Sequence, residues 1–263
     1  MQRGLMASTM VGILCAVVGC YVVLRSMAFL GDAMAHSILP GVAIAYVFKM
    51  DLLVGALVAA IAVALGIGII SRRGNIKEDT AIGILFAAAL SLGVALISTI
   101  KTYSVDLTHI LFGNVLGVRE TDLWITAILG LVVLVTIVLL FKEFLVISFD
   151  PVLAATIRLP AETLRILMLI LIALTIVVSL QTVGVGLVAA MLVTPAATAY
   201  LLTRRLPTMM ILAAIIGAFS SVAGLYISFY VNVASGAVVV LTASAIFLIV
   251  FLFAPRSGLI WRR

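Results

Sequence analysis

Long apolar stretches without a charged residue constrain this chain more than any other feature. Residues 52–70 and 123–141 are two of them, and each is close to the ~20 residues that a helix needs to cross a hydrocarbon layer ~30 Å thick. Hydrophobic residues make up 65% of the chain and charged residues only 10%, whereas soluble domains carry about a quarter charged residues. The apolar surface is therefore expected to face lipid.

The apolar stretches are continuous, which favours helices over the ~10-residue alternating strands of a membrane barrel. Asp32, His36 and Pro40 interrupt the second stretch, and the link between the sixth and seventh is short, so eight and ten crossings stay open alternatives to nine. The prediction is an all-α, polytopic membrane helix bundle that forms one transmembrane domain over residues 1–263. The nine predicted segments are 5–24, 28–48, 52–71, 80–100, 122–141, 165–183, 185–203, 208–231 and 236–254.

Basic residues set the expected orientation in the membrane. If the loop 72–77 is cytoplasmic, twelve of the 16 Lys and Arg residues lie on that side, and only Arg3, Lys49, Lys101 and Arg119 lie outside. This asymmetry follows the positive-inside rule and predicts an outer N-terminus and a cytoplasmic C-terminus. The net charge of +6 is spread over loops instead of one polar face, which argues against a nucleic-acid partner.

Two stretches outside the predicted crossings are long enough to have functions of their own. The outer one, 101–121, contains the apolar run 111–117, which is too short to cross and is interpreted as a re-entrant or interfacial piece. The inner one, about 142–165, mixes charged and apolar residues with two prolines. It is expected to fold into short helices at the membrane surface, where a cytosolic partner can dock.

Asp32 and His36 are ionisable residues inside a predicted crossing. Such a residue costs about 2.5–3.5 kcal/mol on insertion scales and usually faces a cavity or a partner. Four residues apart on a helix, the two share one face, and a carboxylate oxygen with an imidazole nitrogen suits Mn(II), Fe(II) or Zn(II). Two copies of this segment at a homodimer axis would present two carboxylates and two imidazoles. A hydrogen-bonded structural pair and a proton relay are the alternatives.

Pro40 and Gly41 are expected to kink the helix and expose carbonyls beside the pair.

Missing motifs exclude several function classes. The sequence contains no G-x-x-x-x-G-K-[ST] phosphate loop and no H-E-x-x-H zinc protease pattern. His36 and His109 are its only histidines, so an intramembrane enzyme is poorly supported. The chain is expected to be no enzyme, to hold no permanently bound cofactor, and not to bind ATP through a phosphate loop.

Residues 31–46, G-D-A-M-A-H-S-I-L-P-G-V-A-I-A-Y, resemble the ABC-3 family of manganese, zinc and iron importer permeases, whose pattern is similar to G-D-A-L-S-H-A-V-L-P-G-V-A. Three further stretches support the match in the same order. Residues 148–159 are similar to the family's F-D-P-E-x-A loop, 188–205 to its L-L-V-x-P-A-A-T-A-x-L-L helix, and 228–236 to its S-Y-x-x-D-x-P-S-G turn. The resemblance covers almost the whole chain.

The resemblance implies a type II ABC importer-like assembly in a bacterial plasma membrane. Two permease subunits, identical or paralogous, would pair with two cytosolic ABC ATPases, and an extracytoplasmic metal-binding protein would deliver the ion. By the same resemblance Asp32 and His36 are the metal-contacting or gating residues. The proline four residues after His36 is more similar to manganese or iron members than to zinc members.

The same resemblance places the ATPase contact at Asp150, Pro151 and Arg158. Two residues depart from the family pattern there: Val152 replaces the usual glutamate, and Arg158 stands where glycine is common. The predicted function is ATP-driven import of Mn(II), with Fe(II) or Zn(II) as the nearest alternatives. A proton-coupled secondary carrier or channel, with Asp32 and His36 as the relay, is the alternative from another class.

Overall fold

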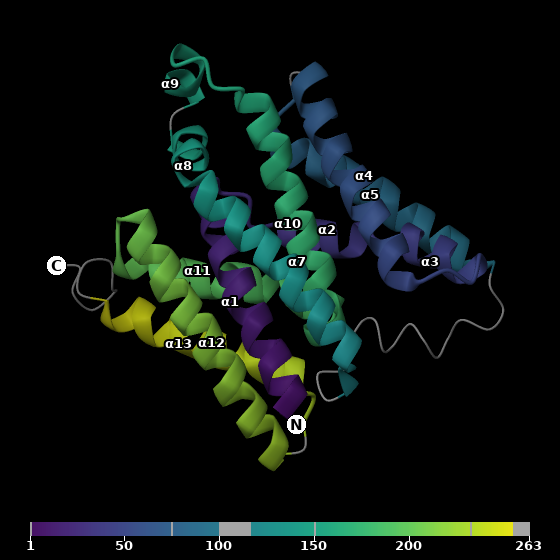
Figure 1. The fold of residues 1–263 in the computed structure, drawn as a ribbon, viewed down its shortest axis with the longest axis vertical. Helices are drawn as coiled ribbons and strands as arrows, with labels where there is room; N and C mark the ends of the chain where they lie inside the picture. Colours follow the sequence, from purple (N-terminus) through teal and green to yellow (C-terminus); the bar gives the residue numbers. More distant parts are fainter. Residues whose placement is uncertain (1, 75, 100–116, 150, 232, 255–263) are drawn as a thin grey trace.

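A computed structural model describes residues 2–74, 76–99, 117–149, 151–231 and 233–254, which form helices and turns with no strand among them (Figure 1). The all-α prediction is therefore confirmed. The helices are α1 (Gln2–Leu24), α2 (Leu30–Ser37), α3 (Leu39–Val47), α4 (Leu52–Arg73), α5 (Glu78–Ser98), α7 (Glu120–Leu139), α8 (Phe141–Phe149), α9 (Pro151–Thr156), α10 (Ala161–Val183), α11 (Val185–Leu202), α12 (Leu206–Val231) and α13 (Ser235–Phe253).

The helices coincide with the nine predicted apolar segments. Eight spans are long and apolar enough to cross a membrane, with α2 and α3 together forming one of them, and α11 supplies a ninth, shorter apolar helix. The inner stretch folds into the short helices α8 and α9, and their position at the membrane surface stays a prediction. The apolar run 111–117 of the outer stretch lies almost entirely outside the described residues.

Helix ends follow from local chemistry. The Asp51 carboxylate accepts a hydrogen bond of 2.8 Å from the backbone N–H of Leu53 and so caps α4. Arg72 and Arg73 end that helix, and Glu78 and Asp79 begin α5, so both pairs of charges complement the helix dipoles. Gly184 turns the chain between α10 and α11 with a φ of 87°, a conformation that glycine adopts without steric cost.

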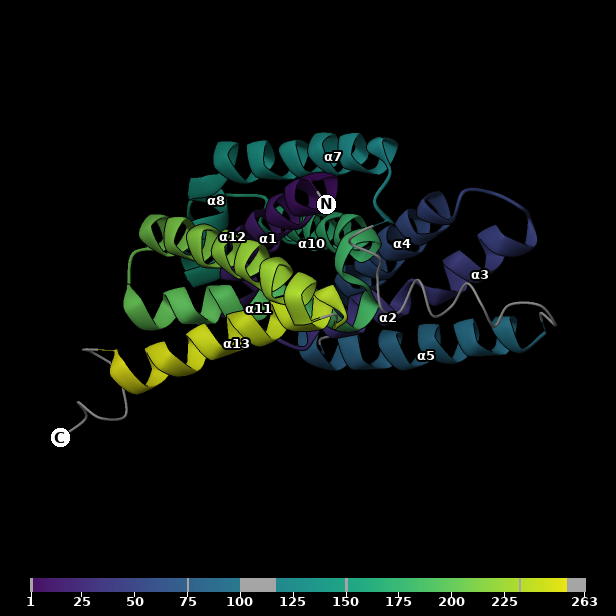
Figure 2. The ribbon, with the colours of Figure 1, turned by 90° about the horizontal axis from the view of Figure 1, so that it is seen from below.

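The core of the bundle is formed by α1, α10 and α11. Figure 2 shows α1 and α10 between α7 on one side and α11 on the other. Almost every residue from Val11 to Val22 is buried. By contrast α5, α7 and α13 bury only a small part of their surfaces, as expected for helices that face lipid or a partner subunit.

Small residues let the helices approach closely. Gly12 of α1 faces Gly217 of α12, and Gly41 of α3 faces Gly55 of α4; in each pair a Cβ on one glycine would overlap the carbonyl of the other. Such small-residue contacts are the usual means of packing helices where lipid removes the hydrophobic drive for association.

Ion pairs group the helix ends as the alternating topology predicts. Arg3 binds Glu120 at 2.9 Å and joins the start of α1 to the start of α7, both of which are expected to be outside. Arg25 binds Glu78 at 3.1 Å and joins the end of α1 to the start of α5, both of which are expected to be inside. The assignment of these sides to the cell exterior and cytoplasm stays a prediction.

Candidate metal site

The site begins with a helix that is interrupted in its middle. Pro40 has no N–H, so the helical hydrogen bond that it would donate to the carbonyl of His36 is missing. That carbonyl accepts from the backbone N–H of Ile38 instead, and the chain divides there into α2 and α3, with Pro40 in the first turn of α3. The predicted break after the Asp32–His36 pair is confirmed, and it lies two residues before the proline.

Asp32 and His36 are the two residues on the open face of α2. Every other residue from 30 to 40 is buried, whereas the side chain of Asp32 is 42% exposed and that of His36 is 28% exposed. The opposite face is fixed against α11: a Cβ at Gly31 would lie 3.3 Å from the Cα of Ala189. Two ionisable side chains are thus held toward the same open side by a helix whose back is packed.

The two side chains lie close together without a direct hydrogen bond. Nε2 of His36 lies 3.6 Å from Oδ1 of Asp32, which is beyond hydrogen-bonding length. Two donors about 2.1 Å from one ion lie about 3.0 Å apart at a right angle and about 3.4 Å apart at a tetrahedral angle. A small change of side-chain rotamer would let both atoms bind one metal ion. Asp32 lies in the first turn of α2, where the helix dipole favours its negative charge.

Aromatic rings stand beside the pair. The ring of Phe86, from α5, lies 6.2 Å from the imidazole of His36 and 5.6 Å from the ring of Phe29. Neither ring was predicted as part of the site. Phe29 could have been found, because it lies one helical turn before Asp32; Phe86 comes from another helix and carries no signal of its own.

The described part of one chain offers few candidate ligands. Among the residues that the structure describes, no group of three or more His, Cys, Asp and Glu side chains is close enough to hold a metal ion. Asp32 and His36 would by themselves offer an ion two donors.

The predicted ATPase contact lies between α8 and α10. Asp150 falls outside the described residues, Pro151 is the first residue of α9, and Arg158 is exposed in the turn before α10. Arg158 has a φ of 57°, a left-handed conformation that favours glycine, and this accounts for the glycine common at that position in the family pattern. Phe144 of α8 is fully buried, with its ring 5.8 Å from that of Tyr21 in α1. The segment is thus anchored to the core.

Comparison with known proteins gives the family. The chain is 49% identical to the manganese transport system membrane protein MntC of Halalkalibacterium halodurans, over 100% of this chain and 90% of that protein. It is 42% identical to a Haemophilus influenzae membrane protein named for iron transport, over 100% of this chain and 93% of that one.

Among solved structures, a chain of PsaBC from Streptococcus pneumoniae, determined in complex with a Fab, superposes with a TM-score of 0.86 at 43% identity. The match covers 97% of this chain and 92% of that chain. The family model described as the ABC 3 transport family matches residues 1–254. This chain therefore belongs to the ABC 3 transport family.

Proposed function

We propose that this chain is the permease subunit of an ATP-driven importer of divalent transition-metal ions, with manganese as its main substrate. The observation that carries the proposal is the open face of α2. There a carboxylate and an imidazole lie 3.6 Å apart on a helix that is otherwise buried. Oxygen and nitrogen donors of this kind suit Mn(II) and Fe(II), the metals in the names of the similar proteins.

Two chains complete the pathway. One chain offers two donors from Asp32 and His36, whereas Mn(II) favours about six ligands in octahedral geometry. A second copy, or a paralogue with the same motif, would add another carboxylate and another imidazole across the dimer axis. Water and the carbonyls beside the helix break would supply the remaining donors.

Energy for transport comes from a cytosolic partner. The sequence lacks a phosphate loop, so ATP hydrolysis is assigned to separate ABC ATPase subunits. The segment from α8 to Arg158 is the docking surface for them, with Asp150, Pro151 and Arg158 at its contact. An extracytoplasmic metal-binding protein delivers the ion to the opposite side, in keeping with an outer N-terminus and a cytoplasmic C-terminus.

The test is metal uptake by proteoliposomes that hold the permease together with its ATPase. We expect uptake of radioactive manganese only when ATP is present on the ATPase side. Uptake by liposomes that hold this chain alone and a proton gradient would contradict the proposal and favour a secondary carrier. Competition with unlabelled Fe(II) and Zn(II) in the same assay ranks the metals.

A further inference from the structure

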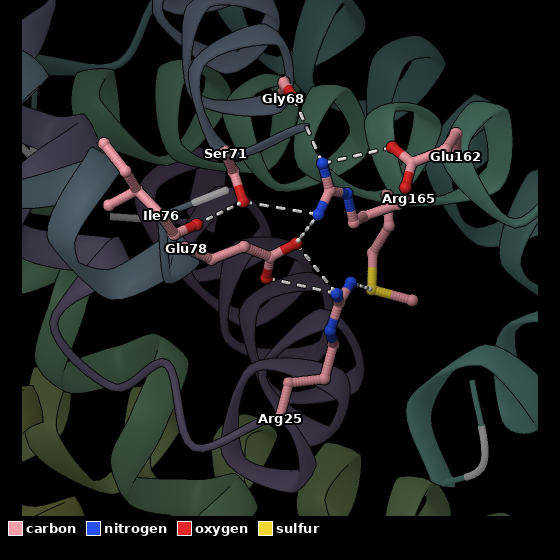
Figure 3. A network of polar contacts seen from close by, with 8 residues as sticks. Arg25, Gly68, Ser71, Ile76, Glu78, Glu162 and Arg165 are labelled. Carbon is pink, nitrogen blue, oxygen red and sulfur yellow. Dashed lines mark hydrogen bonds and ion pairs between the residues drawn. The ribbon is translucent and has the colours of Figure 1, made fainter. Parts of the chain in front are cut away.

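Four charged residues form a partly enclosed cluster at the end of the bundle opposite the Arg3–Glu120 pair. Arg25, Glu78, Glu162 and Arg165 are named here the Glu78 cluster (Figure 3). Arg25, Glu78 and Arg165 have side chains only 14%, 13% and 17% exposed. Charged groups are rarely removed from water to this extent unless they are paired.

Glu78 is the centre of this cluster. One guanidinium nitrogen of Arg25 donates to both of its carboxylate oxygens at 3.1 Å, and Nη1 of Arg165 lies 3.0 Å from Oε1. Burial lowers the pKa of the Arg25 guanidinium, and the Glu78 carboxylate opposes that shift. Removing the Glu78 charge would therefore leave two guanidinium groups facing each other without a shared counter-ion.

Arg165 extends the cluster to a further helix. Its Nη2 donates to the carbonyl of Gly68 at 3.1 Å and its Nη1 to the hydroxyl of Ser71 at 3.4 Å, both in α4. The hydroxyl of Ser71 donates in turn to the carbonyl of Ile76 in the α4–α5 loop. The ends of α1, α4, α5 and α10 are thereby joined by one set of polar contacts, as Figure 3 shows.

On one side the Glu78 cluster lies next to the segment from α8 to Arg158, which is named here the docking segment. Glu162 and Arg165 lie in the first two turns of α10 and bind each other at 3.1 Å. They follow α9 and Arg158 directly along the chain, and α9 packs on both α8 and α10. A displacement of this segment would be passed along the chain to Glu162 and Arg165, and through Arg165 to Glu78.

On the other side the Glu78 cluster is connected in two ways to α2, the helix that carries Asp32 and His36. Arg25 ends the α1 region, and the short turn after it leads into α2. Along α5, Phe86 lies about 12 Å from Glu78 at the rise of an α-helix, and its ring is the one beside His36. The turn that leads into α2 and the helix that carries Phe86 are therefore both anchored to the carboxylate of Glu78.

We propose that Glu78 is a positioning residue through which movement of the docking segment is transmitted to the Asp32–His36 face. The proposal rests on the proposed function, because it requires an ATPase that moves this segment. A hydrophobic contact at this place would join the helices equally well. A shared carboxylate adds directional hydrogen bonds. As the helix ends shift, either arginine can give up one of these bonds to the other while every charge keeps a partner.

The experiment compares ATP hydrolysis and manganese uptake in the reconstituted complex of permease and ATPase. Glu78→Gln keeps the shape of the side chain and removes its charge. We expect the number of manganese ions imported per ATP to fall about tenfold, within the range of measured coupling between sites, while hydrolysis continues. Glu120→Gln is the matched control: it removes the carboxylate of the exposed Arg3–Glu120 pair, whose side chains are 63% and 64% exposed, and should leave the ratio unchanged.

Each outcome decides the matter. A wild-type ratio in Glu78→Gln complexes overturns the inference and leaves the proposed function intact, even if the variant yields less folded protein. Absence of ATP-dependent uptake by the wild-type complex overturns the proposed function and the inference with it. If Glu78→Gln does not assemble, Arg165→Lys replaces it, because lysine keeps the charge and cannot span Glu78, Ser71 and Gly68 together. A wild-type ratio in Arg165→Lys complexes then overturns the inference.

Discussion

Asp32 and His36 depend on a neighbour that belongs to another helix. Phe86 stands beside the imidazole of His36 and the ring of Phe29, so we expect it to restrict the rotamers of His36. The surroundings of the Asp32–His36 face thus come from both α2 and α5.

Phe86→Ala should raise the apparent KM for manganese about fivefold with little change in maximal rate, since an aromatic pair contributes about 1 kcal/mol. Kinetics of uptake by the reconstituted complex measure both quantities. Phe251→Ala is the control, because that residue stacks with Phe247 in α13 at 6.0 Å and should leave the KM unchanged. An unaltered KM in Phe86→Ala would remove the ring from the site.

Arg158 combines an exposed charge with a strained backbone. Its φ of 57° costs an L-residue about 1–2 kcal/mol, so Arg158→Gly should raise the free energy of unfolding by about 1 kcal/mol. Thermal unfolding of the detergent-purified chain measures this. Ala88→Gly is a control of opposite sign: Ala88 is exposed inside α5, where glycine costs about 1 kcal/mol. A lower unfolding temperature for Arg158→Gly would contradict the argument.

The charge of Arg158 is tested separately from its backbone. Arg158→Glu reverses the charge without relieving the strain, and we expect it to change the rate of ATP hydrolysis in the complex while the preference among metals stays the same. Unchanged hydrolysis would remove Arg158 from the ATPase contact.

At the scale of helices, the crossing of α1 and α12 depends on glycine. A Cβ at Gly217 would lie 3.0 Å from the carbonyl carbon of Gly12 and 3.1 Å from the Cβ of Ala16. Gly217→Ala should therefore destabilise the fold by about 1–3 kcal/mol, the usual cost of overpacking.

Gly83 is the matched control for this prediction, because a Cβ there meets nothing within 4 Å. Gly83→Ala should stabilise α5 by about 0.5–1 kcal/mol. Thermal unfolding of both variants tests whether Gly217→Ala loses stability and Gly83→Ala gains it. Equal effects of the two substitutions would show that close approach of α1 and α12 is not required.

The helices could be predicted because every crossing except the second is a continuous apolar run, which is a local property of the sequence. The break in the second crossing could also be predicted, since Pro40 removes a backbone donor. The contacts of Phe86 and Glu78 could not, because they join residues about 50 positions apart or more. A glutamate in the charged start of an apolar helix cannot be distinguished in the sequence from a solvated helix-end charge, because Arg25 and Arg165 come beside it only in the fold.

At the scale of the whole molecule, a packed core of α1, α10 and α11 carries the Asp32–His36 face on one flank and the segment from α8 to Arg158 at one end. Family membership supports the assignment of this architecture to metal import. Under the proposed function this arrangement separates the two tasks: the ion would contact side chains of α2, and the ATPase would contact the segment from α8 to Arg158.

The central claim is that Asp32 and His36 hold the transported ion. The most direct measurement is ATP-dependent manganese uptake by the reconstituted complex with Asp32→Ala, with His36→Ala, and with Asp79→Ala as a control carboxylate that is exposed at the start of α5. Uptake should fall at least about 100-fold in the first two variants, since loss of a ligand exceeds the about 10- to 100-fold cost of losing an outer-shell partner. It should be unchanged in the third. Wild-type uptake by correctly assembled Asp32→Ala and His36→Ala complexes would contradict the account and leave the two residues as a structural pair.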